Sequence, residues 1–118
     1  MQSDNGYTFG GYSKIGFKAT KYFNEYKIDN KCFLFSINLK RIYPSIRDKA
    51  NICYIGDSYG LCFNNSLGFY DNFMKRNDNK IHQSIKTYFN GLQQEYEMNG
   101  GESKFKIKEL EVFQLYKN

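Results

Sequence analysis

Few residues in the sequence have the types and spacing that acid–base chemistry needs. His82 is the single histidine, and it lies beside a turn rich in Asn and Asp, where a histidine is more often a surface residue than a general base. Glu109 and Glu111 stand two positions apart, so on a strand their carboxylates would share one face and could act as an acid–base pair. The competing interpretation is a polar strand face opposite Leu110 and Val112. We expect no catalytic residue among them.

Three cysteines, Cys32, Cys53 and Cys62, could in principle carry thiol chemistry. Their odd number and the lack of C-x-x-C spacing predict neither a disulfide framework nor a zinc site. A reactive thiol should be exposed and have a depressed pKa near cations or a helix N-terminus. These cysteines instead fall in apolar segments, so we interpret them as reduced core thiols. Thiol-dependent removal of peroxide remains the alternative function from the enzyme class.

The stretch "GYTFGGYSKIGF" at residues 6–17 raises the question of a phosphate-binding loop. Gly11 and Gly16 have the spacing of a P-loop, but Phe17 and Lys18 occupy the positions of its Lys and Ser or Thr. The dinucleotide-binding pattern G-x-G-x-x-G is not matched either. We therefore expect no cofactor, and we predict that Gly10 and Gly11 turn the chain after a short strand at 6–9.

The composition bounds the class of protein. The 118 residues suffice for one domain with a core, and 41% hydrophobic with 19% aromatic residues exclude a wholly disordered chain. The net charge of +5 raises the possibility of non-specific nucleic-acid binding, the second alternative, although only three of the cations are Arg and most of the aromatic residues are at positions expected in the core. No membrane span, leader or metal-ligand cluster is recognisable, so we expect a cytoplasmic protein.

Apolar runs separated by turn residues predict a β-rich fold. The clearest run is "KCFLFSINL" at 31–39, which we expect to be a strand covered on both faces. We expect the segment 40–50 to be a connection broken at Pro44, and 76–80 to be a surface turn. Further strands are predicted at 50–56, 61–63 and 67–74.

Two segments carry a conflict in their pattern. In 81–92 the apolar residues fall at helical spacing, but a strand through "QSIKTYF" at 83–89 is the alternative. In 104–116 the apolar residues change phase near Lys108 and Glu109. A β-bulge there would bring Phe105, Ile107, Leu110 and Val112 to one face.

Four segments, in order, resemble the motifs of the TLDc domain family: "FGGYS" at 9–13, "FLFSI" at 33–37, "YGLCF" at 59–63 and "IKELEVFQL" at 107–115. The resemblance extends over nearly the whole chain, and its motif positions are Phe9, Gly10, Gly11, Tyr12, Phe33, Phe35, Gly60, Phe63, Glu109, Glu111 and Val112. There are departures: the chain lacks the Trp that usually follows the first motif, and Leu61 replaces the usual Pro.

The resemblance implies a β-sandwich of two antiparallel sheets with short helices at its periphery, and a strand at 83–89. The closing strand should lie next to the Gly10–Gly11 segment. It also implies a single domain over 1–118 that lacks the N-terminal part of the family domain, whose loss would expose apolar surface. The implied function is a non-catalytic protein-interaction domain that protects against oxidative damage, binds and regulates the vacuolar proton ATPase, or does both.

Overall fold

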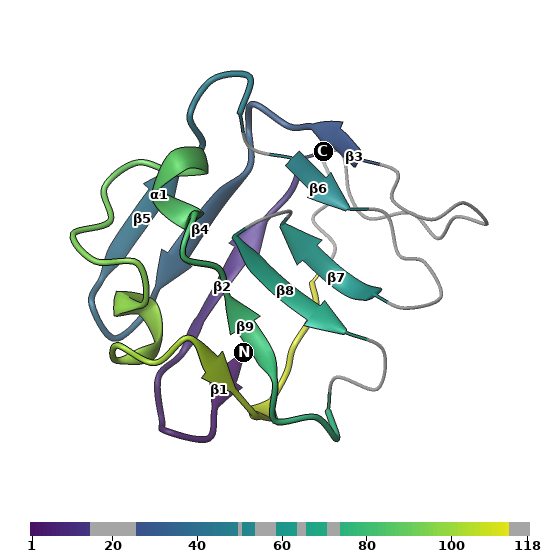
Figure 1. Ribbon diagram of the computed structural model, residues 1–118, viewed down its shortest axis with the longest axis vertical. Helices are drawn as coiled ribbons and strands as arrows, with labels where there is room; N and C mark the ends of the chain where they lie inside the picture. The colour runs from purple at the N-terminus through teal and green to yellow at the C-terminus, as the bar shows by residue number, and fades with distance from the viewer. Residues whose placement is uncertain (15–25, 50, 54–58, 64–65, 71–73, 114–118) are drawn as a thin grey trace.

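The computed structural model describes residues 1–14, 26–49, 51–53, 59–63, 66–70 and 74–113 (Figure 1). In chain order the strands are β1 (Gln2–Ser3), β2 (Phe9–Tyr12), β3 (Tyr26–Ile28), β4 (Phe33–Ser36), β5 (Arg41–Pro44), β6 (Asn51–Cys53), β7 (Tyr59–Phe63), β8 (Leu67–Tyr70), β9 (Asn79–Ile81), β10 (Lys104–Phe105) and β11 (Ile107–Glu109). The helical elements are α1 (Ile85–Tyr88) and the 3₁₀ turn η1 (Glu97–Asn99).

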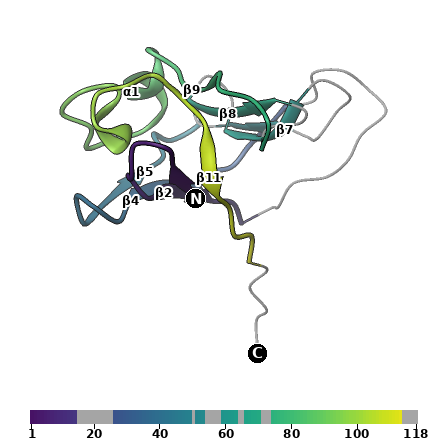
Figure 2. The same ribbon diagram turned by 90° about the horizontal axis from the view of Figure 1, so that it is seen from below.

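The strands form two layers, as the resemblance implies. A six-stranded sheet has the order β10-β9-β8-β7-β6-β3, a three-stranded sheet has the order β2-β4-β5, and β1 pairs with β11. All of these pairings are antiparallel. Figure 2 shows β2, β4 and β5 in one layer, and β7, β8, β9 and α1 in a second layer that packs against one face of it. The expected antiparallel sandwich is confirmed.

The core fills the space between the two sheets because alternate residues of each strand point inward. From the three-stranded sheet the inward residues are Phe9, Leu34 and Tyr43, all fully buried. From the other side the core receives Phe63, Leu67, Phe69, Ile81, Ile85, Phe89, Met98, Phe105 and Ile107. Phe9 and Phe105 join the first and last parts of the chain, which confirms that the closing strands lie next to the Gly10–Gly11 segment.

The prediction that Gly10 and Gly11 form a turn is wrong. Both lie within β2, where they pair with Phe35 and Leu34, and neither has positive φ. Glycine is needed here for close approach: a Cβ on Gly11 would stand 2.4 Å from the ring of Phe63, and one on Gly10 would stand 2.9 Å from the ring of Phe35.

The segment around β4 and β5 also differs from the expectation. The strand expected at 31–39 covers only Phe33–Ser36, and only its Leu34 and Ser36 face is fully buried. Residues 37–40 form a turn, and the segment expected to be a connection contains β5, paired with β4 along its length. Pro44 is tolerated because β5 is the edge strand of its sheet.

The strand expected at 83–89 is wrong, and the helical periodicity was the better guide. Ile85 and Phe89 are one turn apart and both buried, and the Phe89 N–H donates to the Ile85 carbonyl. The expectation of a surface turn at 76–80 is wrong at its end, where the fully buried Asn79 begins β9.

The predicted bulge in the last strand is present at the expected place. Gln2 lies opposite Glu109 and Ser3 opposite Ile107, so Lys108 is the additional residue on β11. Its expected consequence is only partly correct. Leu110 packs against the core, but β11 ends at Glu109 and Val112 is 70% exposed.

Candidate functional site

The first two motifs that carried the resemblance lie side by side in the three-stranded sheet. Gly10 is opposite Phe35, and Tyr12 is opposite Phe33. The rings of Tyr12 and Phe33 stack with centroids 5.0 Å apart and planes inclined by 24°. The third motif joins them from the other layer: Gly60 and Phe63 belong to β7, and the Phe63 ring reaches Gly11. Gly11 and Phe63 therefore pack between the sheets, whereas Gly10, Tyr12, Phe33 and Phe35 lie on the outer face of the three-stranded sheet.

The last motif does not join that cluster. Glu109, Glu111 and Val112 are all exposed at the end of β11 and beyond it. The Met1 amino group donates to the Phe9 carbonyl at 2.9 Å. Burial lowers the pKa of this amino group, and the charge of Glu111 only partly offsets that effect. Nothing in this geometry couples the two carboxylates to a reacting group.

The reactive side chains singled out in the sequence are spread through the fold. His82 is half-buried, and its pKa is lowered by burial and by the charge of Lys80. Cys32 and Cys62 are buried free thiols. Burial, with the nearby Asp29 carboxylate, raises the pKa of Cys32 to about 12, which opposes formation of the nucleophilic thiolate. The side chain of Cys53 lies outside the described residues.

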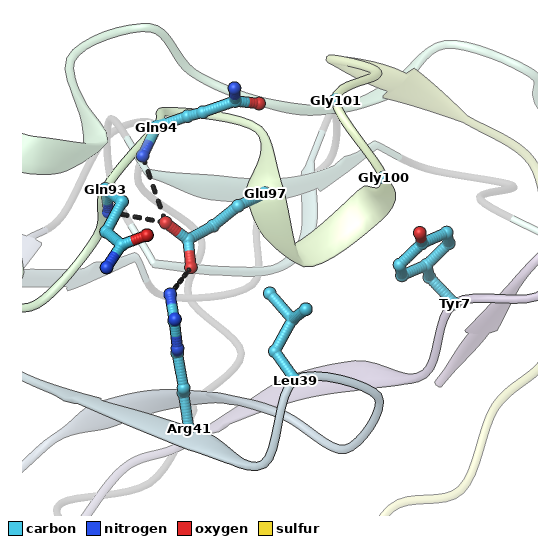
Figure 3. Close-up of a pocket in the computed structure, with 8 residues that line it drawn as sticks. All are labelled: Tyr7, Leu39, Arg41, Gln93, Gln94, Glu97, Gly100 and Gly101. Carbon is cyan, nitrogen blue, oxygen red and sulfur yellow. Dashed lines mark hydrogen bonds and ion pairs between the residues drawn. The ribbon is translucent and has the colours of Figure 1, made fainter.

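A pocket of about 380 Å³ opens between the β4–β5 turn and the segment around η1 (Figure 3). Its walls are Tyr7, Leu39, Arg41, Gln93, Gln94, Glu97, Gly100 and Gly101. The left-handed Gly100, with φ of 66°, ends η1, and a Cβ there would stand 2.5 Å from the Tyr7 ring. Only glycine at position 100 therefore leaves room for the Tyr7 ring in the wall of the pocket.

Glu97 is held by hydrogen bonds to both of its carboxylate oxygens, and its side chain is only 9% exposed. One oxygen, Oε2, accepts from Arg41 Nη1 at 2.9 Å and from the Tyr43 hydroxyl at 2.7 Å. The other, Oε1, accepts from the backbone N–H groups of Gln93 at 2.5 Å and Gln94 at 3.0 Å. Figure 3 shows Arg41 reaching up from β5 to this carboxylate.

These contacts decide the charge state of the pair. Burial alone would raise the pKa of Glu97, but the hydrogen bonds from Gln94, Tyr43, Gln93 and Arg41 outweigh it and lower that pKa. Burial and the bond to Glu97 raise the pKa of Tyr43. Glu97 is thus a charged acceptor with its lone pairs engaged, and Tyr43 stays a neutral donor. The network joins β5 to η1 and is unsuited to proton transfer.

The pocket's free polar groups are the side-chain amides of Gln93 and Gln94, which make no hydrogen bond within the described ranges. Together with Leu39 and Tyr7, these amides could bind a polar or peptide-like group without catalysing a reaction. Sequence reasoning missed this site entirely. The available signal was the Gly100–Gly101 pair, which is typical of the end of a short helical turn.

Among the described residues, no group of three or more His, Cys, Asp or Glu side chains could hold a metal ion. No helix in this part of the chain is both long enough and apolar enough to cross a membrane.

Comparison with known proteins gives one match. The model of the TLDc domain family matches residues 1–116. No curated protein and no solved structure matches the chain.

Proposed function

The chain belongs to the TLDc domain family, and on that basis we propose that it acts as a non-catalytic protein-interaction domain. One observation carries the proposal beyond family membership. The groups best placed for chemistry are engaged in the fold: Glu97 accepts four hydrogen bonds, and the Cys32 thiol is buried. A rigid sandwich with variable loops is a common scaffold for binding other proteins.

The finer proposal is that this domain protects the cell from oxidative damage and binds the vacuolar proton ATPase in the cytoplasm, modulating its assembly or activity. Family membership supports this proposal. The raised pKa of Cys32 disfavours this thiol as a peroxide-reducing group.

The test is binding of the purified full chain to purified proton-pump subcomplexes, measured by co-sedimentation or biolayer interferometry. Because the net charge is +5, the experiment should run at about 0.15 M salt and again at higher salt, where non-specific charge attraction weakens. An unrelated basic protein of similar size is the matched control. We expect saturable binding that the control lacks. Binding no stronger than that of the control would contradict the proton-pump assignment.

A further inference from the structure

The outer face of the three-stranded sheet is an apolar surface outside the core. Phe9, Leu34 and Tyr43 point inward, so their neighbours in β2, β4 and β5 point outward. The outward residues are Tyr12, Phe33, Phe35, Ile42 and Pro44, which we call the aromatic face. The register places Phe35 opposite Ile42 and Phe33 opposite both Tyr12 and Pro44, so these side chains are contiguous across three strands.

This face is partly open to solvent. Ile42, on the edge strand β5, is 66% exposed, and Ile37 in the adjoining turn is 59% exposed. Phe33 and Phe35 are half-buried by their neighbours, and Phe35 lies across Gly10. In Figure 2 the labelled elements of the other layer all lie on the opposite side of this sheet. Contiguous apolar surface of this kind often marks an interaction site.

Charge around the aromatic face is strongly positive. Residues 9–14 and 28–49, which contain its strands and turns, carry six Lys and Arg but only two Asp, and one of the six cations, Arg41, is paired with Glu97 from outside these ranges. Of the Asp residues, Asp29 is buried and accepts from Ser13, and Asp48 lies near Arg47. Lys14, Lys31, Lys40 and Lys49 are exposed and form no ion pair within the described ranges. A partner should therefore be acidic.

Two other anionic partners fit less well. Membrane-binding surfaces project aromatic side chains into the lipid interface, whereas Phe33 and Phe35 lie half-buried within a sheet. Single-stranded nucleic acid needs open ring faces on which bases can stack, but the Tyr12 and Phe33 rings stack on each other. Ile42 and Pro44 form the aliphatic part of the aromatic face, and such a surface favours contact with apolar side chains of a protein partner.

We propose that the aromatic face binds an acidic protein segment that carries large apolar side chains. The apolar side chains would cover Ile42 and Phe35, and the acidic groups would face the unpaired lysines at the strand ends. This inference rests on the proposed function, because it names the surface and the partner chemistry of that interaction domain.

The experiment uses the full chain, isotope-labelled for NMR, and a short synthetic peptide that alternates Asp with Leu or Phe. A peptide with Lys in place of Asp is the control probe. We expect shifts concentrated on β4, β5 and their connecting turn, and at least tenfold weaker binding of the Lys peptide. Ile42→Glu should weaken binding about tenfold or more, because it adds a like charge and removes an apolar contact. Val112→Glu, at a comparably exposed position, should leave it unchanged.

Several results would overturn the inference. These are shifts that map to another surface, equal binding of the two peptides, or tighter binding of anionic vesicles or oligouridine that Ile42→Glu abolishes. A dimer in light scattering that Ile42→Glu dissociates would assign the face to a second copy and overturn the inference too.

The proton-pump assay separates the two proposals. If Ile42→Glu binds the pump as wild type does, only this inference fails; if wild type does not bind it, the pump assignment fails and the peptide result stands alone.

Discussion

The ring of Phe105 stands edge-on to that of Phe9, with centroids 5.2 Å apart and planes inclined by 84°. This contact joins β10, near the end of the chain, to β2, near its beginning. Phe69 meets the same Phe105 ring at 6.3 Å and 86°. One aromatic side chain thus connects both sheets of the sandwich, and edge-to-face geometry adds to the stabilisation that burial provides.

Phe105→Ala should be among the most destabilising single changes in the chain. The side chain is 2% exposed, and its loss would remove two ring contacts and leave a cavity. We expect the free energy of unfolding to fall by about 3–5 kcal/mol, measured by urea denaturation. Phe113→Ala, at a position 76% exposed, is the matched control and should change it by less than about 0.5 kcal/mol. Equal effects would mean that Phe105 is not part of the core.

Gly11→Ala should destabilise the fold more than Gly10→Ala. A Cβ on Gly11 would meet the buried Phe63 and Leu34, whereas one on Gly10 would meet only the half-buried Phe35 ring. We expect a cost of about 1–3 kcal/mol for Gly11→Ala from overpacking. Gly10→Ala should be closer to neutral, because Phe35 can shift and alanine restricts the unfolded chain. Thermal unfolding of the two variants checks the order, and the reverse order would refute the packing argument.

Glu97→Gln should weaken the connection between β5 and η1. The neutral amide cannot accept equally from Arg41, Tyr43 and two backbone N–H groups, so we expect a loss of about 1–3 kcal/mol near neutral pH. Tyr43→Phe removes one donor and should cost less. Urea titrations at pH 7 measure both, and a wild-type value for Glu97→Gln would show that the carboxylate is dispensable.

The same carboxylate makes stability depend on pH. Its folded pKa is lowered, so its contribution is fully present above the unfolded pKa of about 4.3 and is lost as pH falls through the folded value. Wild type should therefore lose stability on acidification below about pH 5 more steeply than Glu97→Gln. Parallel curves for the two proteins would contradict the assignment of the lowered pKa.

Cys32 should react slowly with disulfide reagents while the protein is folded. In a Cys53→Ser/Cys62→Ser background, a folded pKa of about 12 leaves on the order of a thousandfold less thiolate than an ordinary cysteine has. The rate of reaction with Ellman's reagent near pH 8 should rise by at least a hundredfold in denaturant. A folded rate within tenfold of the unfolded one would reopen the peroxide-removing alternative, which consumption of hydrogen peroxide by wild type would then test.

Local patterns in the sequence predicted part of this structure. The apolar runs predicted a β-rich fold, and the resemblance carried by the four motifs implied the antiparallel sandwich. The phase change in 104–116 located the bulge at Lys108. The helical spacing of Ile85 and Phe89 was also informative, although the resemblance argued for a strand there. These features depend on side chains within a few residues of one another, so the sequence displays them directly.

Other features followed from contacts between distant residues. The bond from Tyr43 to Glu97 joins positions 54 residues apart, and the need for glycine at position 11 comes from Phe63 in the other sheet. Nothing near Glu97 in the sequence marks it as the acceptor of four hydrogen bonds. Likewise the run at 31–39 has almost no polar alternation, yet one face of β4 is buried and the other is half-buried.

The sequence by itself therefore determined the family, the strand-rich class and the approximate order of the elements, because periodicity and motif order are properties of neighbouring residues. Only the tertiary structure decided which face of each strand is covered, which carboxylate has both oxygens engaged in hydrogen bonds, and where the aromatic face remains exposed to solvent. Those outcomes depend on the pairing of strands and the packing of sheets, which bring together side chains whose separation along the chain gives no sign of their contact.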